Sequence, residues 1–221
     1  MLSDPEDLVR DRVSERIDLE FKSILPGRGD KDKFEILKDF SAFANSGGGI
    51  VYYGIAEEDG VANALQPITA ENFDEATRRL GQTIESGIEP RLQGVRFEKF
   101  EIGDGYVLAG MVPARFGAPC RTVQNGQSKF FKRSQNFVSE MTYDEIRSAF
   151  DRAGTARQIL EDSWTFRLEQ TRKRETWKPM LGGPICLARL SPLSSYRQTD
   201  AADLKALYGD YASFIYPDWG G

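Results

Sequence analysis

The sequence has no histidine among its 221 residues. Histidine is the usual general base of enzymes, it activates serine and cysteine nucleophiles, and it is a common zinc ligand. Its absence excludes histidine-dependent nucleophile pairs and most zinc sites. Any catalysis would therefore depend on carboxylates, lysine, tyrosine or a metal-bound water.

Cysteine is scarce as well. Cys120 and Cys186 lie far apart, and no Cys-x-x-Cys motif is present. A disulfide between them would be unusual in a cytosolic protein, and free cysteines are commonly buried. We therefore expect two packed thiols.

Long hydrophobic runs are also missing. The longest, Ile50–Ala56 and Tyr106–Val112, are far shorter than the roughly 20 residues that span a bilayer. The first residues are acidic and lack the apolar core of a secretory signal. These features predict no membrane segment and a cytoplasmic location.

An excess of positive charge is absent, because the formal net charge is −5. Such a balance argues against non-specific coating of nucleic acid, which requires neutralisation of many phosphates. A local basic surface stays open. Its candidate residues are Arg121, Lys129, Lys132 and Arg133, followed by the basic stretch 167–178.

Residues 17–22 alternate between apolar and polar side chains. This period of two predicts a half-buried strand, with Ile17, Leu19 and Phe21 on one face. Glu20 and Lys22 then point in the same direction.

A helix and a buried strand are expected next. Apolar residues at helical spacing predict a helix over 32–45, three glycines at 47–49 end it, and Ile50–Ile55 follows as a strand. The glycines follow the C-terminal end of this helix, whereas phosphates bind at helix N-termini. No Gly-Lys-Ser/Thr is present, so ATP binding is disfavoured.

The remaining pattern extends one α+β domain over residues 1–153. Its further elements are a helix over 70–86, a hairpin of 95–102 with 106–113, a strand over 129–133 and a helix over 142–153. Residues 154–221 are predicted to form a polar connecting helix over 155–178 and a C-terminal extension, with a strand over 185–190 and a short helix over 201–208.

Carboxylates and one lysine form the candidate chemical site. Glu20 and Lys22 on one strand face are either a solvated charge pair or part of a site that holds a divalent cation and stabilises negative charge. Glu15 must enter from a turn or helix end, because its spacing of five would place it opposite Glu20 on a straight strand. If Glu57 approaches from the neighbouring strand, three carboxylates surround Lys22.

The Lys129–Arg133 segment alternates cations with phenylalanines. It is either a surface that holds a phosphate backbone with help from stacking, or an ordinary strand whose phenylalanines lie in the core. Both interpretations are open from the sequence.

Glu15–Lys22, Ser41–Gly48, Gly54–Glu57 and Phe131–Ser134 together resemble the AlbA-type domain of the Schlafen family, over about residues 12–152. The resemblance implies a mixed sheet with flanking helices. It also implies a metal-dependent endoribonuclease that acts on structured RNA such as tRNA, with a role as a toxin or defence effector.

Carried over by position, the catalytic and metal-binding residues implied by this resemblance are Glu15, Glu20 and Glu57, with Lys22 beside them and Mg²⁺ or Mn²⁺ as the cofactor. Glu57 stands where the family has Asp, and the adjacent Glu58 or Asp59 could substitute for it. The resemblance covers one copy of a domain that Schlafens contain twice, so we expect a homodimer. The alternatives are a non-catalytic DNA- or RNA-binding module of a transcriptional regulator, and a domain used for oligomerisation.

Overall fold

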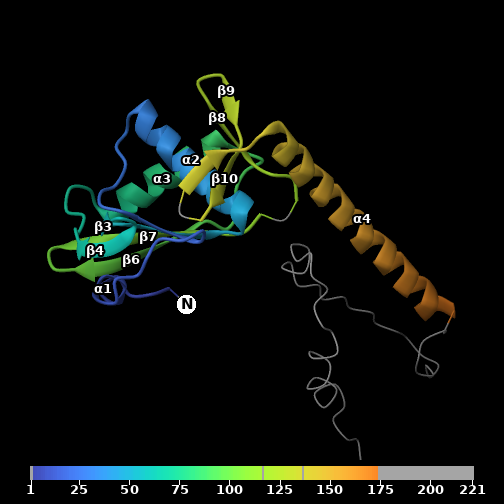
Figure 1. The fold of residues 1–221 in the computed structure, drawn as a ribbon, viewed down its shortest axis with the longest axis horizontal. Coiled ribbons are helices and arrows are strands. Elements are labelled where there is room, and N and C mark those ends of the chain that lie inside the picture. The colour runs from blue at the N-terminus through green and yellow to red at the C-terminus, as the bar shows by residue number, and fades with distance from the viewer. Residues whose placement is uncertain (1, 116, 136, 174–221) are drawn as a thin grey trace, which may run out of the picture. The chain divides into compact units, whose positions relative to one another are not determined.

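The computed structural model describes residues 2–115, 117–135 and 137–173. The chain divides into two compact units, Met1–Arg157 and Gln158–Gly221. The helices (Figure 1) are α1 (Pro5–Arg10), α2 (Asp30–Ser46), α3 (Phe73–Gly87) and α4 (Tyr143–Lys173). The strands are β1 (Leu19–Lys22), β2 (Gly49–Tyr53), β3 (Ile55–Glu58), β4 (Val61–Leu65), β5 (Ile88–Glu89), β6 (Arg96–Ile102), β7 (Gly105–Val112), β8 (Arg121–Gln124), β9 (Gln127–Lys129), β10 (Phe131–Ser134) and β11 (Phe137–Glu140). The predicted α+β class is confirmed.

The central sheet has the strand order β1-β2-β7-β6. β1 and β2 are parallel, and the other pairs are antiparallel. Smaller sheets accompany it: the pairs β3–β4 and β10–β11, and the three-stranded sheet β5-β8-β9. β1 therefore forms an edge of the central sheet.

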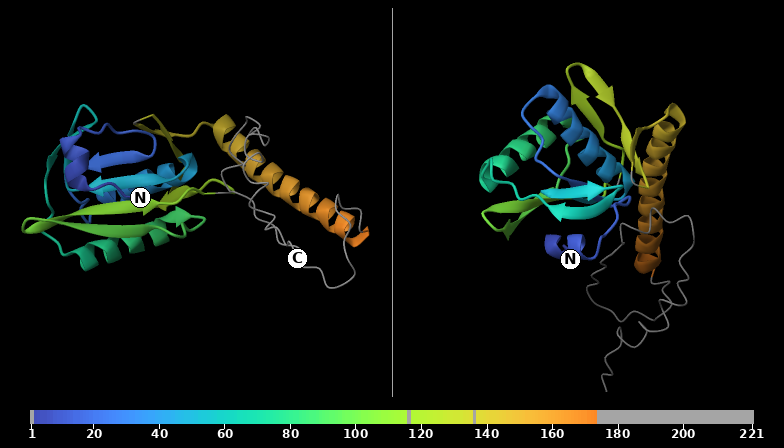
Figure 2. Two further views of the ribbon diagram at one scale, coloured as in Figure 1. Left: turned by 90° about the horizontal axis from the view of Figure 1, so that it is seen from below. Right: turned by 60° about the vertical axis from the view of Figure 1, so that its left-hand side comes forward.

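Helices cover both faces of this sheet (Figures 1 and 2). On one face, α2 and α3 pack on a core that includes Phe40, Val51 and Tyr53. On the other face, α1 packs on a core that includes Leu19 and Phe21. Because strand side chains alternate in direction, the residues between them, Glu20 and Lys22, face α2.

The prediction of a half-buried first strand was wrong. Leu19 and Phe21 are 3% exposed and Glu20 is only 9% exposed, so both faces of β1 are covered. The strand begins at Leu19 because Arg16 and Leu19 exchange backbone hydrogen bonds around a tight turn. Ile17 lies in that turn and is 43% exposed.

The single predicted strand over 50–55 is interrupted at Gly54. Its φ of +101° is a backbone conformation that residues other than glycine rarely adopt, and an added Cβ would lie 3.2 Å from the carbonyl oxygen of Gln66. The chain turns at Gly54 from β2 into β3. As predicted, Gly47 ends α2, in the left-handed conformation.

A capping box formed by Thr142 and Glu145 begins α4, at the predicted start of this helix. The amide of Glu145 donates to Oγ1 of Thr142, and the amide of Thr142 donates to the Glu145 carboxylate at 3.0 Å. The predicted helix end at 153 was wrong, because the helix runs on past Gly154 to Lys173. Gly154 has no atom within 4 Å of an added Cβ, so it serves neither a turn nor a close approach.

Cys120 is buried as a free thiol, which confirms that part of the cysteine prediction. Cys186, the strand over 185–190 and the helix over 201–208 lie outside the described residues. None of the helices in the described ranges combines the length and apolar character needed to cross a membrane.

Candidate functional site

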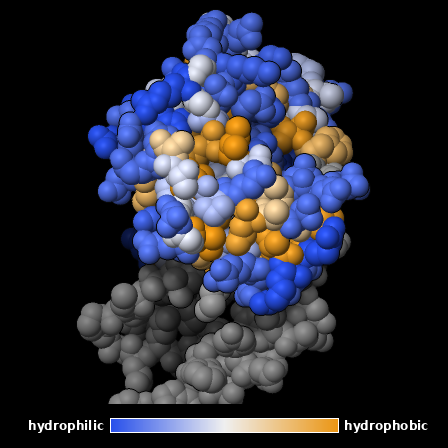
Figure 3. All heavy atoms as spheres, turned by 90° about the vertical axis from the view of Figure 1, so that its left-hand side faces the viewer, coloured by the Kyte–Doolittle hydropathy of each residue, from blue (hydrophilic) through white to orange (hydrophobic). Residues whose placement is uncertain are grey.

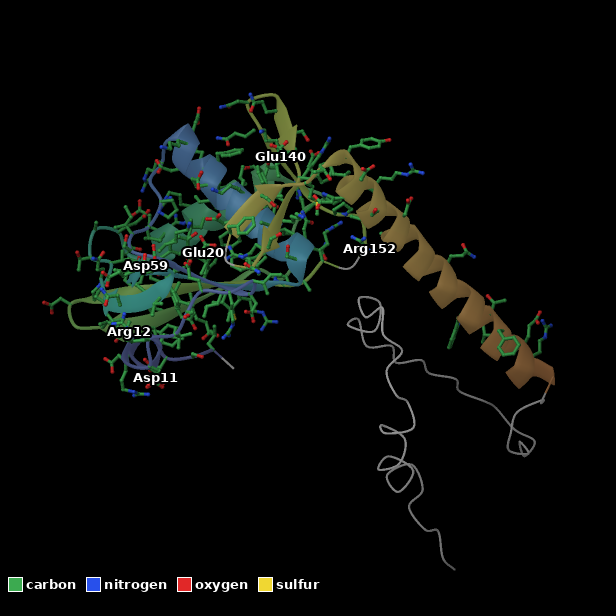
Figure 4. All side chains as sticks on the ribbon, in the orientation of Figure 1. Asp11, Arg12, Glu20, Asp59, Glu140 and Arg152 are labelled. Atoms are coloured by element: carbon green, nitrogen blue, oxygen red, sulfur yellow. The ribbon has the colours of Figure 1, made fainter. Side chains whose placement is uncertain are left out.

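Three elements bring a network of alternating charges together beneath α2. The Nζ atom of Lys22 on β1 lies 2.5 Å from Oε1 of Glu20 and 3.2 Å from Oδ2 of Asp39 on α2. The second oxygen of Glu20 accepts a hydrogen bond from Nη1 of Arg133 on β10. Figure 4 labels Glu20 at this edge of the sheet. The order of charges is Asp39, Lys22, Glu20 and Arg133.

Arg133 is an interior residue, with no exposed side-chain surface. Its guanidinium lies 4.3 Å from the centroid of the Phe43 ring, and its Nη2 donates to the carbonyl oxygen of Arg16 at 3.3 Å. Its backbone amide donates to Oγ of Ser46 at 2.7 Å. Among the described residues, its Nε is one of three buried side-chain atoms without a hydrogen-bond partner. Arg133 thereby connects β10 to both α2 and β1.

Burial and charge compete within this network. Burial alone would raise the pKa of Glu20, but Lys22 and Arg133 outweigh it and hold that pKa below its ordinary value. Burial alone would lower the pKa of Lys22, but Asp39 and Glu20 outweigh it and raise that pKa. Burial, helped by the charge of Glu20, raises the pKa of Asp39 to about 6 despite the neighbouring Lys22. Lys22 is thus a permanent cation between two carboxylates.

Glu15 lies in the connection between α1 and β1. Its backbone amide donates to the carbonyl oxygen of Gly60 at 2.6 Å, and its Oε1 accepts the amide of Phe21 at 2.9 Å. The carboxylate therefore satisfies an N–H group on the free edge of β1. Burial, together with the negative charges of Glu20 and Glu57, raises the pKa of Glu15. Glu15 therefore lies close enough to both Glu20 and Glu57 to be repelled by each of them.

Glu57 lies on β3 and is exposed. Its Oε2 accepts the amide of Gly60 at 2.6 Å, within the turn that leads to β4. Glu58 and Asp59 follow directly, and Asp59 has a φ of +54° in the same turn. Glu57 thus approaches Glu15 through the β3–β4 turn, whose Gly60 bonds both residues.

The arrangement of these carboxylates does not fit a metal ion as it stands. Within the described ranges, no group of three or more acidic, cysteine or histidine side chains is placed to hold one. Both oxygens of Glu20 face cations, and Glu15 and Glu57 each accept a backbone amide. A divalent ion prefers oxygen ligands that carry no competing cation.

An acidic residue pairs with each of the three basic residues predicted together with Arg133 to contact nucleic acid, whereas the basic stretch 167–178 lies partly outside the described residues. Arg121 pairs with Glu89 at 3.0 Å, Lys129 with Glu140 at 2.7 Å, and Lys132 with Glu145. These three side chains are partly exposed, unlike that of Arg133. Contact of Arg121, Lys129 and Lys132 with a phosphate would replace an existing ion pair rather than fill an empty basic patch.

The two phenylalanines of the Lys129–Arg133 segment have different surroundings. Phe131 is 6% exposed, and its ring lies edge-on to that of Phe34 at 5.8 Å between centroids. Phe130 is half-buried, edge-on to Phe150 at 6.1 Å. The core interpretation therefore holds for Phe131.

Asp39 was not predicted as a residue of the candidate site. It is 2% exposed and lies on the same helix face as Ile36, Phe40 and Phe43, which are core residues. A carboxylate on the apolar face of a predicted helix is a signal in itself, because a buried acid needs a partner. Tyr53 belongs to the same surroundings: burial, followed by the charges of Asp39 and Glu20, raises its pKa.

A groove begins directly after Lys22. It has a volume of about 630 Å³ and runs between the loops 23–28 and 66–71, with Arg79 of α3 at one wall. Arg79 holds Glu71 through two hydrogen bonds. Figure 3 shows the left-hand side of the Figure 1 view, where small apolar areas are surrounded by polar ones.

Comparison of the sequence with models of known protein families identifies one match. Residues 15–142, more than half of the chain, match the family model described as Schlafen, AlbA_2. A search of the curated proteins found no match.

Two solved structures show limited likeness. The DIP2311 protein from Corynebacterium diphtheriae has 17% identity and a TM-score of 0.44, and the match covers 67% of this chain. This chain spans only 27% of that protein. The N-terminal domain of a RecG-related protein from Nitrosomonas europaea also has 17% identity and a TM-score of 0.44, with 64% of this chain and 94% of that one covered. Such TM-scores say nothing about function.

The matched segment contains the complete trio of carboxylates together with Lys22, Asp39 and Arg133. The family implies a function related to nucleic acid. On the match over residues 15–142, the chain belongs to the Schlafen AlbA_2 family.

Proposed function

We propose that this chain is an endoribonuclease that cleaves structured RNA such as tRNA at the edge of β1. The observation that carries the proposal is that Glu15 lies beside both other acids: its carboxylate accepts the amide of Phe21, next to Glu20, and its own amide bonds Gly60, whose amide the Glu57 carboxylate accepts. Mutual repulsion among acids is costly to a fold, and such perturbed groups concentrate at functional sites. Lys22, bonded to Glu20, adds a fixed positive charge.

These residues suit phosphodiester cleavage. A general base works best when its pKa lies near the working pH, and the pKa of Glu15 is shifted in that direction by burial and by its acidic neighbours. Cleavage also places extra negative charge on the phosphorus oxygens, which a fixed cation stabilises. Lys22 supplies that cation, since its raised pKa keeps it charged.

Mg²⁺ or Mn²⁺ remains part of the proposal as the cofactor that the family resemblance implies. Glu15, Glu20 and Glu57 would hold it, and it would supply Lewis acidity at the phosphate. The carboxylates would first have to exchange their present N–H and cation partners for the ion. Metal dependence is therefore tested separately from cleavage.

The test is incubation of the purified chain with total tRNA, in Mn²⁺ and in EDTA, beside the variants Glu15→Gln and Glu57→Gln. Glutamine keeps the oxygen that accepts the amide of Phe21 or Gly60, so each variant removes charge while conserving the local hydrogen bond. Loss of cleavage in both, with unchanged urea unfolding, is the expected result. Glu85→Gln is the control, because Glu85 is an exposed acid paired only with Arg91 on another part of the surface.

A second candidate is a DNA- or RNA-binding module that does no chemistry. It is favoured by the pairing of both Glu20 oxygens with cations, which makes the network complete without substrate. Binding would then weaken steeply with salt, need no metal ion, and survive in Glu15→Gln and Glu57→Gln. Uncut tRNA that is retarded on a native gel equally in all three proteins would favour this candidate.

A homodimer also belongs to the proposal, because two copies would present two such edges to one RNA. Sedimentation with and without tRNA tests it. Under the first candidate we expect two chains per RNA. One chain per RNA would remove the dimer from the proposal without removing cleavage.

A further inference from the structure

Asp39 joins the candidate site through an ion pair with Lys22. It lies at the middle of α2, its side chain is 3% exposed, and its Oδ2 is 3.2 Å from Lys22 Nζ. Glu20 approaches the same ammonium at 2.5 Å. The amine is therefore held from two sides by carboxylates on two different elements.

We infer that Asp39 is a positioning residue that fixes the ammonium of Lys22 beside Glu20 for the reaction. This rests on the proposed function, since the reaction is the cleavage proposed above. Asp39 itself is too deeply buried to contact RNA. Its effect would reach the substrate through Lys22, whose side chain is 34% exposed.

The physical need for such a residue follows from the lysine side chain. A lysine ammonium is a point charge on a flexible four-carbon stem, and it can occupy many positions if only one partner holds it. Glu20 is also drawn toward Arg133, so it does not define the position of Lys22 alone. Asp39 comes from a rigid helix whose neighbouring residues Phe40 and Phe43 are fully buried. Asp39 therefore supplies a second contact, at a fixed position, for the ammonium of Lys22.

The cost of burying Asp39 supports a role beyond packing. Isolated carboxylates are rarely buried, and an apolar residue at the centre of α2 would serve the core better. The groups that face Asp39 are Lys22 and Glu20 from β1, Lys38 from its own helix, and Tyr53 from β2. Of these, Lys22 is the one that it contacts as an ion pair.

The test compares Asp39→Asn with wild type in two measurements. The first is the rate at which trace acetic anhydride modifies Lys22, read by mass spectrometry with Lys99 as the internal reference. Loss of Asp39 should lower the pKa of Lys22 and speed its acetylation, by about tenfold for each pKa unit lost. The second is cleavage of tRNA. We expect kcat to fall on the order of 10- to 100-fold with KM unchanged, as for a misplaced group in an intact binding site.

Three further variants separate positioning from folding. In Lys22→Met, the added change Asp39→Asn should have no further effect on kcat, because nothing is left to position. The double variant also replaces the ion pair by two neutral side chains, so it remains informative if Asp39→Asn alone fails to fold. Glu35→Gln, an acid of the same helix that pairs with Lys38 instead, should leave kcat unchanged.

The outcomes distinguish this inference from the proposed function. Unchanged acetylation of Lys22 in Asp39→Asn, or unchanged kcat, would overturn the positioning role while cleavage by the wild type stands. An additive loss in the double variant would overturn it as well. If the wild type cuts no RNA, the proposed function fails and the catalytic role of Asp39 fails with it, and a faster acetylation would then show only a structural ion pair.

Discussion

Arg133 donates a hydrogen bond to Glu20 from 113 positions further along the chain, and neither residue has a side chain that is more than slightly exposed. The pair joins β10 to the edge strand of the central sheet. A buried ion pair is costly to form, but it is also costly to break on one side, because the remaining charge stays in the interior without its partner.

Replacing Arg133 by methionine should therefore destabilise the fold. Methionine keeps much of the volume beside Phe43 but leaves Glu20 with Lys22 as its one remaining cation. We expect the free energy of unfolding in urea to fall by about 3–5 kcal/mol. Arg121→Met is the control, because the Arg121–Glu89 pair is exposed and such pairs contribute about 1 kcal/mol or less. Equal losses in the two variants would contradict the buried role of Arg133.

Asp39 should make stability depend on pH. Its pKa in the folded chain is about 6, above the ordinary value of 3.8, so the folded state binds the proton more tightly. The contribution of Asp39 to the free energy of unfolding is fully present below about pH 4. It is lost as the pH rises toward 6, with a slope of up to about 1.4 kcal/mol per pH unit. Urea unfolding of wild type and Asp39→Asn between pH 4 and 7 measures it, and the difference between the two curves should change over this interval.

Glu20 should act in the opposite direction. Its pKa is held below the ordinary value of 4.5 once Lys22 and Arg133 outweigh burial, so its contribution is present above that value. It is lost as the pH falls through the folded pKa. The Asp39→Asn variant should therefore still lose stability below pH 4.5. A stability curve that stays level on acidification would show that Glu20 is not paired as described.

Gly54 should not tolerate a side chain. Its φ of +101° and the Gln66 carbonyl oxygen at 3.2 Å from an added Cβ both oppose alanine, so Gly54→Ala should cost at least about 1 kcal/mol. It should also reduce cleavage, because Gly54 directs the chain toward Glu57. Gly81→Ala is the matched control: Gly81 lies within α3 with open space around it, and alanine there should stabilise by about 0.5–1 kcal/mol.

RNA binding should respond to the ion pairs of the β9–β11 region. Lys129→Gln should weaken binding and reduce the slope of log affinity against log salt by about one. Glu140→Gln should strengthen binding, since it frees Lys129 from its acidic partner. Filter binding at several salt concentrations measures both. Arg91→Gln, on the surface near α3, should change neither the RNA affinity nor its salt dependence. If Arg91→Gln weakens binding as much as Lys129→Gln does, the effect comes from the overall charge of the protein and not from a local contact.

Much of the fold could be predicted from local patterns in the sequence. The helix expected over 32–45 is α2, its glycine stop is the observed one, and the hairpin turning at Gly103 has the predicted strands. These features depend on periodicity and on backbone preferences of a few neighbouring residues. The helix predicted over 142–153 continues through Gly154, because one glycine costs a helix only about 1 kcal/mol and does not by itself end it.

The site was less predictable, because its contacts join distant parts of the chain. The face shared by Glu20 and Lys22 followed from alternation along one strand. The contact of Lys22 with Asp39 depends on how α2 docks on the sheet, and that of Glu20 with Arg133 depends on how β10 packs beside α2. No local pattern encodes such docking, so Arg133 was assigned to the surface with Lys129 and Lys132.

The position of Arg133 has a consequence during synthesis. β1 leaves the ribosome long before β10. Glu20 therefore has no contact with Arg133 until more than a hundred further residues have been synthesised. Closing so long a loop is slow, and an edge strand without its partners can pair with other chains in the meantime. Nascent chains cut short before Arg133 should therefore depend on chaperones, whereas chains that include α4 should release them.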